Sequence, residues 1–273
     1  MPRVVHFLGP ERTFAHAAAL SMFKAGETLV PEPSVLDVFE ALNDNPSDLG
    51  LVPIENTIEG SVTMTLEALA ATEDLLVVGE VVIEIEQCLM GQGPLAGIRR
   101  VLSHPHALAQ CKHWLRKNLP HAQLVTTPST AAGATECRGR PENAAVGSEL
   151  AAEPSELLVL ARGIQDQQHN ATRFVVLGRK LPPASGRDKT SVLFDAPHER
   201  GALRRALAIF DDNELNLSRI ESRPMRGERW KYFFYADIEG HVDDPPVARA
   251  LQQLRQGTRR VKVLGSYPQA PEL

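Results

Sequence analysis

The sequence predicts an α/β protein, with a two-lobed domain over residues 1–181 and a smaller βαββαβ unit over residues 189–273. Three observations support this prediction. Short apolar strands alternate with helices through the first domain, which is typical of α/β proteins. The chain is expected to cross between the lobes near residues 79 and 167, so a cleft and a hinge are expected. Residues 182–188 have the Pro-, Ser- and Gly-containing composition of a linker.

The first lobe, residues 1–78 and 167–181, is expected to begin with two strands and three helices. Strands are recognised as short apolar runs, and helices by apolar residues on one face. In chain order these elements are a strand at 4–8, a helix from Thr13 to Lys24, a helix at 35–42 capped by Ser34, a strand at 49–54, and a helix that starts at Gly60 and continues to Ala70.

The second lobe, residues 79–166, is entered through a long extended segment. Residues 77–90 are rich in Val and Ile, with glutamates at regular intervals, which indicates one strand with a solvated face. A strand of this length is expected to pass from one lobe to the other. The elements expected after it are strands at 100–102, 123–125, 144–146 and 157–160, and helices at 105–119 and 129–137.

A polar run, Asp166–Phe174, returns the chain to the first lobe and leads into an apolar strand at 175–177. Hydrogen-bonding and charged side chains are thus expected at the mouth of a strand, where α/β proteins usually bind ligands. The alternative is a polar turn in which Arg173 makes a surface ion pair.

Beyond the linker, strands and helices follow in the order βαββαβ, which is the ferredoxin-like arrangement. Pro224 marks a strand end or a sheet edge, and a free edge favours pairing with another subunit. The strands are expected at 190–194, 215–221, 230–238 and 260–264, and the helices at 201–210 and 246–254.

Length and composition exclude several classes of protein. The chain has 273 residues, of which 43% are hydrophobic and 23% charged, and no apolar run reaches membrane-spanning length. The early strand leaves no room for a signal peptide, and the three cysteines are widely spaced, so a cytoplasmic protein with reduced thiols is expected. The net charge of −5 argues against nucleic acid binding. No His, Cys or carboxylate group has metal-ligand spacing, so no metal is expected.

Two segments of the first domain share one design. Asn56 and Thr57 directly follow a buried strand, as do Ser103 and His104, and a helix is expected soon after each pair. Helix N-termini carry unpaired N–H groups and a partial positive charge, which suits a bound carboxylate. The alternative is that both segments are ordinary helix caps.

Five segments, in this order along the chain, resemble prephenate dehydratases with a C-terminal ACT regulatory domain. The resemblance covers almost the whole chain and implies a periplasmic-binding-protein-like fold for the two-lobed domain. No chorismate mutase helices precede the first strand, so a monofunctional member is expected. The matching segments are VPIENTIEG at 52–60, SHPHALAQC at 103–111, TRF at 172–174, GAL at 201–203 and ESRP at 221–224.

The sequence departs from the family motifs at a few positions. Arg12 replaces a glycine, and Ala15 replaces a serine. Thr57 stands where serine is usual and keeps the hydroxyl group, while His106 stands where glutamine is usual. The backbone conformation at Arg12 and the role of His106 are both open.

The resemblance implies a lyase that converts prephenate to phenylpyruvate, with loss of water and carbon dioxide and without a cofactor. Thr172 would hydrogen-bond or protonate the leaving hydroxyl; because threonine alone is a weak acid, a relay or polarising role is expected. Arg173 is implied either as a carboxylate clamp or as an ion pair that holds the turn. The residues implied as substrate contacts are Thr13, Asn56, Thr57, Ser103, Gln110 and Arg173.

The ACT resemblance implies feedback inhibition by L-phenylalanine, bound between two C-terminal units and coupled to closure of the cleft. This arrangement requires a homodimer or a homotetramer. Two other functions stay open: an arogenate dehydratase, and a non-catalytic two-lobed amino-acid sensor. The residues implied as walls of the effector site are Gly201, Ala202, Leu203, Asn216, Leu217, Glu221, Ser222, Arg223 and Pro224.

Overall fold

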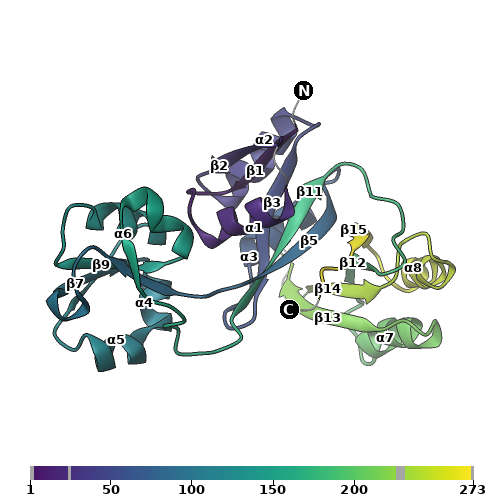
Figure 1. The fold of residues 1–273 in the computed structure, drawn as a ribbon. Helices are drawn as coiled ribbons and strands as arrows, with labels where there is room; N and C mark the ends of the chain where they lie inside the picture. Colours follow the sequence, from purple (N-terminus) through teal and green to yellow (C-terminus); the bar gives the residue numbers. More distant parts are fainter. Residues whose placement is uncertain (1–2, 24–25, 226–230, 272–273) are drawn as a thin grey trace.

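A computed structural model describes residues 3–23, 26–225 and 231–271. Figure 1 shows three parts in a row, with the second lobe at the left, the first lobe in the centre and the C-terminal unit at the right. This arrangement of mixed sheets and helices confirms the predicted α/β fold class. In the described part of the chain, no helix combines the length and apolar character that crossing a membrane requires.

The first lobe is a sheet with helices on both faces. α1 packs on one face with Phe7 and Leu51, and α2 and α3 pack on the other with Val52 and Val175. Its elements are β1 (Val4–Leu8), α1 (Phe14–Met22), β2 (Thr28–Glu32), α2 (Val35–Asp44), β3 (Leu49–Asn56), β4 (Gly60–Ser61), α3 (Thr63–Ala71), β5 (Leu76–Glu84) and β11 (Ala171–Gly178).

The second lobe is a five-stranded sheet in the order β10-β6-β9-β7-β8, again with a core on each face. Its strands are β6 (Cys88–Gly91), β7 (Arg100–Ser103), β8 (Gln123–Thr126), β9 (Asn143–Gly147) and β10 (Leu158–Ala161). Its helices are η1 (Leu95–Gly97), α4 (Pro105–Gln110), α5 (Lys112–Asn118), α6 (Thr130–Cys137), η2 (Glu149–Ala151) and η3 (Glu153–Ser155).

The C-terminal unit has the expected βαββαβ order. Its sheet continues the sheet of the first lobe, because β15 pairs with β5 at Gly265 and Val77, and the full order is β13-β14-β12-β15-β5-β11-β3-β1-β2. The elements are β12 (Asp188–Asp195), α7 (Ala202–Asp212), β13 (Leu217–Pro224), β14 (Tyr232–Glu239), α8 (Pro245–Gly257) and β15 (Val261–Pro268).

The C-terminal unit shares a hydrophobic core with the first lobe. All eight residues of β12 are buried, which requires that both faces of the strand are covered. α7 and α8 cover one face, and α3 covers the other through Leu66 and Leu69, which pack with Tyr235 and Tyr267. Burial of each large apolar side chain stabilises the folded state by about 1.5–3 kcal/mol, so this contact fixes the unit against the lobe.

The single strand predicted over residues 77–90 is wrong. β5 ends at Glu84 in the first lobe, and β6 begins at Cys88 in the second. Between them, the backbone N–H of Gln87 donates to the side chain of Gln165 in the returning segment, at 3.0 Å, so strand pairing is interrupted there. The lobe boundary expected at residue 78 therefore lies at residues 85–87.

Four other predictions need correction. The sequence pattern misses β2 because Pro31 interrupts it, although proline is compatible with an edge strand. Gly60 begins the short strand β4 and not a helix, and the helix expected at 105–119 is broken at Cys111. β11 already begins at Ala171, so the TRF segment lies within a strand and not in a loop. Two expected members of elements, Lys24 and Trp230, lie outside the described residues.

Candidate active site

A cavity of about 380 Å³ lies between the two lobes. Both lobes and the first crossing contribute to its wall. The residues that line it are Leu8, Gly9, Pro10, Thr13, Phe14, Ala15, Pro53, Asn56, Glu59, Val62, Ile85, Gln87, His104, His106, Ala107, Gln110, Pro128, Ser129, Thr130, Thr172 and Phe174. We call this cavity the interlobe cleft.

Three helix N-termini face the interlobe cleft: those of α1, α4 and α6. Their N-cap residues, Thr13, His104 and Ser129, each accept a hydrogen bond from a first-turn amide and line the cleft. Other first-turn amides have no partner within a helix, and each N-terminus carries a partial positive charge. None of the described residues that line the cleft is Lys or Arg. The positive potential for an anionic ligand therefore comes from the helix ends.

One hydrogen bond determines how the Thr172 hydroxyl can act. Thr172 and Asn56 are register partners in β11 and β3, and Asn56 Nδ2 donates to Thr172 Oγ1 at 2.9 Å. A hydroxyl has one proton and two lone pairs, and this bond occupies a lone pair. The Thr172 proton is therefore available to an acceptor in the interlobe cleft.

A β-bulge lies beside this pair. Arg173 pairs with Glu55 and Phe174 with Pro53, so Ile54 of β3 has no register partner. Bulges redirect neighbouring side chains and are common beside active sites. Here the bulge directly precedes the position at which Asn56 reaches Thr172.

A chain of side-chain amides connects Thr172 to Glu59 by way of Gln110 in the second lobe. Glu59 Oε1 accepts from Gln110 Nε2 at 3.0 Å, and Gln110 Oε1 in turn accepts from Gln87 at 3.1 Å and from Asn170 at 3.5 Å. Asn170 Oδ1 accepts from Asn56 Nδ2 at 2.8 Å, and Asn56 Oδ1 accepts two backbone amides. Because backbone amides only donate, they make Asn56 Nδ2 a donor and so set the direction of every bond from Asn56 to Glu59.

Thr57 fastens the returning segment to the first lobe. Its hydroxyl donates to the carbonyl of His169 at 3.1 Å and accepts from the amide of Ala171 at 3.0 Å. Its own amide donates to the carbonyl of Ala171 at 2.9 Å. Thr57 is not among the residues that line the cleft, so its role in the structure is to join the returning segment to the first lobe, and not to contact the substrate.

The structure also contradicts two other implied substrate contacts, Ser103 and Arg173. Ser103 is fully buried and donates to the carbonyl of Val146 at 2.6 Å, so it joins β7 to β9 and does not reach the cleft. Arg173 is directed away from the cleft and contacts the C-terminal unit. The cause is strand alternation: Thr172 and Phe174 face the cleft, and the residue between them faces the other side of the sheet. The ion-pair alternative for Arg173 is thus correct, but the ion pair is buried and not on the surface.

The remaining implied substrate contacts, Thr13, Asn56 and Gln110, line the cleft, and their polar groups already form hydrogen bonds within the protein. The Thr13 hydroxyl donates to the carbonyl of Pro10 at 2.9 Å, and Gln110 is part of the amide chain. Arg12, which precedes Thr13, has φ 69°, a conformation that glycine adopts freely. The turn therefore keeps the glycine-type backbone in spite of the arginine.

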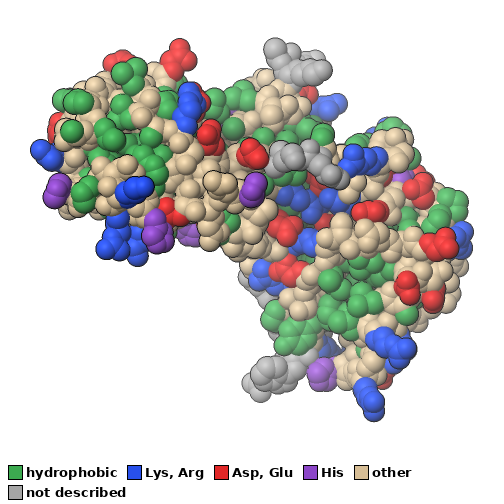
Figure 2. Space-filling view, turned by 60° about the horizontal axis from the view of Figure 1, so that its bottom comes forward, with side chains coloured by type: hydrophobic (Ala, Val, Ile, Leu, Met, Phe, Trp, Pro, Cys, Tyr) green, Lys and Arg blue, Asp and Glu red, His purple; other side chains and the backbone are tan. Residues whose placement is uncertain are grey.

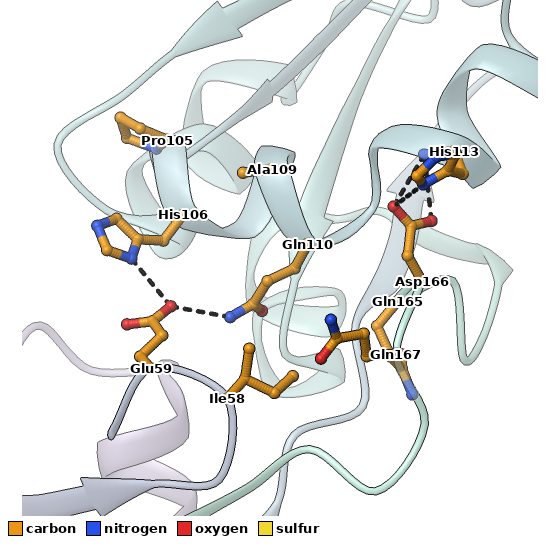
Figure 3. A pocket seen from close by; sticks show the side chains of 10 residues that line it. All are labelled: Ile58, Glu59, Pro105, His106, Ala109, Gln110, His113, Gln165, Asp166 and Gln167. Carbon is orange, nitrogen blue, oxygen red and sulfur yellow. Dashed lines mark hydrogen bonds and ion pairs between the residues drawn. The ribbon is translucent and has the colours of Figure 1, made fainter. Parts of the chain in front are cut away.

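A second, larger cavity of about 630 Å³ adjoins the cleft (Figure 3). Glu59, His106 and Gln110 line both cavities, and His106 Nδ1 lies 2.9 Å from Glu59 Oε1. His106, the departure from the family motif, therefore joins α4 of the second lobe to the first lobe. Across the described residues, no three His, Cys, Asp or Glu side chains gather where they could hold a metal ion.

Some cleft residues are missed by reasoning from the sequence. Ser129 and Thr130 follow β8 and begin α6, the same strand-to-helix design that singles out Ser103 and His104, so a consistent search for that design finds them. Gln87 gives no such signal, because its place at the first crossing depends on where β5 ends.

Burial, together with His106, lowers the pKa of His104, so this imidazole is neutral near pH 7 and adds no charge to the cleft.

The residues implied as effector walls lie at both ends of β13. Ala202 and Leu203 follow Gly201 (φ 80°) at the start of α7 and line a small cavity of about 180 Å³ with Tyr232, the register partner of Pro224. Asn216 and Leu217 lie at the opposite end, where Asn216 donates to Glu239 at 2.9 Å. An eight-residue strand is about 25 Å long, so one phenylalanine cannot contact both ends within one chain.

The middle of this strand faces the first lobe. The Glu221 carboxylate accepts from the Ser61 hydroxyl in β4 and from Arg219 and Arg223. Burial opposes ionisation of Glu221, but the Ser61 hydroxyl and the two guanidinium groups outweigh it and lower its pKa. Glu221 is therefore a contact between domains in this chain.

Comparison with known proteins gives consistent matches over the whole chain. The family model described as "Prephenate dehydratase" matches residues 5–182, and the model described as "ACT domain" matches residues 190–256. A bifunctional chorismate mutase/prephenate dehydratase of Aquifex aeolicus is 42% identical and aligns with 97% of this chain and 74% of its own length. A prephenate dehydratase of Amycolatopsis methanolica is 37% identical over 99% of this chain and 90% of its own.

Solved structures agree with these matches. A prephenate dehydratase of Arthrobacter aurescens in complex with L-Phe has a TM-score of 0.88 and 37% identity, over 97% of this chain and 90% of that chain. GqqA, described as a novel type of quorum quenching acylase, also has a TM-score of 0.88, with 32% identity over 98% of this chain and 99% of its own.

Proposed function

Since the chain belongs to the prephenate dehydratase family, we propose that it is a lyase that converts prephenate to phenylpyruvate in the biosynthesis of L-phenylalanine. The observation that carries this proposal is the bond from Asn56 to Thr172, because it leaves the Thr172 proton to the interlobe cleft. The matches to both family models over nearly the full chain support it.

The reaction makes two demands on the protein. Prephenate carries a carboxylate on the ring, a second carboxylate on the pyruvyl side chain, and a hydroxyl on the ring carbon opposite the first. The bond to the ring carboxylate breaks, its electron pair makes the ring aromatic, and the bond to the hydroxyl breaks. Carbon dioxide leaves, and the hydroxide takes up one proton to leave as water. The protein must therefore deliver one proton and hold a dianion in one orientation.

Thr172 is the residue that meets the first demand. Its hydroxyl accepts from Asn56 and donates to the departing oxygen, so that charge developing on the leaving group is met by a donor that is already oriented. The amide chain from Glu59 holds Asn56 and Asn170 in the required direction. Threonine is a weak acid, and preorganisation of this donor therefore contributes more than its acidity.

The three helix N-termini meet the second demand. A carboxylate at a helix N-terminus is stabilised by about 0.3–1 kcal/mol at exposed positions and by up to about 2 kcal/mol at partly buried ones. Ends from both lobes contribute, α1 from the first and α4 and α6 from the second. A dianion between them favours a closed cleft.

The same reasoning extends to regulation by L-phenylalanine and to a homo-oligomer. An ACT domain is present, and the relative from Arthrobacter aurescens was solved with L-Phe. Because the implied effector walls are too far apart within one chain, a complete site needs the β13 edge of a second copy. The exposed Ile220 on this edge supports such a pairing. Ile220→Lys is expected to abolish dimers, as measured by light scattering, and inhibition by L-phenylalanine, as measured by an activity assay. A monomeric variant that L-phenylalanine still inhibits would contradict this proposal.

The acylase relative shows that the fold alone does not select a reaction. Covalent acyl transfer requires an activated nucleophile. The described cysteines do not supply one, because Cys88, Cys111 and Cys137 are buried, and burial raises the pKa of Cys88 to about 11 and those of the other two to about 12. None of these cysteines is therefore an activated nucleophile, and the family-model matches support the dehydratase reaction.

Turnover of prephenate is the direct test. Purified protein is incubated with prephenate and, separately, with arogenate, and release of carbon dioxide and of the aromatic product is followed. Faster turnover of prephenate supports the proposal, and faster turnover of arogenate changes the substrate but not the reaction. Binding without turnover of either compound contradicts the proposal and favours a two-lobed sensor.

A further inference from the structure

Arg173 in the catalytic strand makes a hydrogen bond through each of its three guanidinium nitrogen atoms. Nε lies 2.6 Å from Glu80 Oε2 in β5 of the same lobe. Nη1 lies 2.6 Å from Asp237 Oδ2 in β14, and Nη2 donates to the hydroxyl of Tyr267 in β15 at 2.8 Å. Two of the three partners therefore belong to the C-terminal unit.

The surroundings of Arg173 form a largely buried polar cluster. Lys189 of β12 lies 2.9 Å from the second oxygen of Glu80, and the Ser191 hydroxyl lies 2.5 Å from Asp237 Oδ1 and 2.6 Å from the Tyr267 hydroxyl. The two cations and two anions named here are at least nearly buried, and Arg173 Nη1 also lies 3.7 Å from Oε2 of the more exposed Glu55 in β3. On the molecular surface, Figure 2 shows Lys and Arg side chains beside Asp and Glu side chains in the middle of the molecule.

The charge states in this cluster are fixed by its members. Burial opposes ionisation of Asp237, but Arg173 and the Ser191 hydroxyl outweigh it and lower its pKa. Burial likewise opposes the charged form of Arg173, but Tyr267, Asp237 and Glu80 outweigh it and raise its pKa. A planar guanidinium with three fixed partners has little freedom to move, unlike a lysine ammonium at the same place.

The direct neighbour of this anchored residue is Thr172. Both lie in β11, which Figure 1 shows between β3 and β5 beside the C-terminal unit, and successive side chains of a strand point to opposite faces. The anchor on one face therefore fixes the backbone from which the Thr172 hydroxyl reaches into the cleft on the other. A displacement of about 1 Å at such a group is enough to lower a rate about 100-fold.

We propose that Arg173 is a positioning residue for Thr172, and that the C-terminal unit holds the catalytic hydroxyl in place through Asp237 and Tyr267. This inference rests on the proposed dehydratase function. It also gives the C-terminal unit a direct route to the active site within one chain, since any shift of β14 or β15 is transmitted to β11 through one guanidinium.

Two tyrosines of the C-terminal unit offer a matched pair of variants. Tyr267 and Tyr235 are both buried in the core shared with the first lobe, and each makes one hydrogen bond to that lobe. Tyr267 bonds Arg173, whereas Tyr235 donates to the carbonyl of Leu66 in α3, away from β11. Tyr267→Phe and Tyr235→Phe therefore weaken the same domain contact, and only the first touches Arg173.

The test compares kcat, KM and amide hydrogen exchange in the full chain. Tyr267→Phe is expected to lower kcat roughly tenfold, with KM within about twofold, and to speed exchange at residues 171–174. Tyr235→Phe is expected to leave kcat, KM and that exchange unchanged. Arg173→Lys, which keeps the charge but loses the planar fork, is expected to behave as Tyr267→Phe does or worse.

Other outcomes overturn the proposal. If Tyr235→Phe loses as much kcat as Tyr267→Phe, the general domain contact matters and not Arg173. Wild-type kcat and exchange in both Tyr267→Phe and Arg173→Lys exclude a positioning role. If the wild-type protein does not turn over prephenate, the dehydratase function fails, while hydrogen exchange at residues 171–174 still shows whether the C-terminal unit holds this strand.

Discussion

At the scale of single residues, the proposed role of Thr172 depends on the direction of one hydrogen bond. Asn56 can donate to Thr172 only because its carbonyl oxygen is held by the amides of Ile58 and Glu59. With that oxygen occupied, the amide nitrogen must face Asn170 and Thr172. The amide side chain of Asn56 is therefore required because its nitrogen donates a hydrogen bond to Thr172, as well as for its size.

Asn56→Asp tests this requirement with almost no change of shape. The variant loses the donor to Thr172 and places a negative charge near a dianionic substrate, so kcat/KM is expected to fall at least about 100-fold. Steady-state kinetics measure the effect, and the midpoint of thermal unfolding serves as a control for folding. A kcat/KM within threefold of wild type would mean that the donor is not needed.

The sequence identifies some of these residues and misassigns others, each for a physical reason. Asn56, Gln110 and Thr172 can be found from motifs, and all three line the cleft. Arg173 is misassigned because its role depends on strand alternation, and the start of β11 at Ala171 is not visible in a polar run. Ser103 is misassigned because a buried side-chain-to-backbone bond leaves no trace in the sequence.

At the scale of elements, the returning segment holds the start of a helix. Asp166 accepts from the backbone amides of His113 and Trp114 in the first turn of α5, at 2.9 and 3.1 Å, and from the His113 ring (Figure 3). The residue that caps this helix is thus about fifty positions away in sequence, and the break of the predicted helix at Cys111 could not be foreseen.

Replacement of Asp166 is expected to change stability in a pH-dependent way. Partial burial opposes ionisation, but the amides of His113 and Trp114 outweigh it and hold the pKa of Asp166 below its ordinary value of 3.8. A lowered folded-state pKa stabilises the protein above the unfolded-state pKa, and this stabilisation is lost as the pH falls through the folded-state value. Asp166→Asn should therefore cost about 1 kcal/mol at pH 7 and progressively less below about pH 4.

Denaturant unfolding at several pH values measures this difference. His113→Ala is the control, since it removes the ring contact and leaves both backbone bonds to Asp166 in place. A cost for Asp166→Asn that does not change between pH 7 and pH 3 would contradict the assignment of Asp166 as an ionised cap.

At the scale of the whole molecule, the C-terminal unit is part of the architecture of the first lobe. The two share a core and a sheet, and the sheet is joined where β15 meets β5. The βαββαβ order can be predicted from the sequence, because it depends on local patterns. The docking of the C-terminal unit on the first lobe cannot be predicted from the sequence, because it depends on which face of β12 and β14 contacts α3.

Gly265→Ala tests this junction. A Cβ atom at Gly265 would lie 2.1 Å from the carbonyl oxygen of Val77 and 2.6 Å from its Cβ, so the strands would have to separate. The free energy of unfolding is expected to fall by about 1–3 kcal/mol, together with a lower kcat. Gly257→Ala is the control, because the end of α8 has open space there and alanine favours a helix by up to about 1 kcal/mol. Equal stability of Gly265→Ala and wild type would mean that the junction does not hold the unit.

The most direct test of the account is kcat on prephenate for Thr172→Val and Thr172→Ser. Valine keeps the shape and removes the hydroxyl, whereas serine keeps the hydroxyl. Thr172→Val is expected to lower kcat at least about 100-fold with KM within about threefold, and Thr172→Ser is expected to retain kcat within about tenfold of wild type. A Thr172→Val enzyme that forms phenylpyruvate at the wild-type rate would contradict the account.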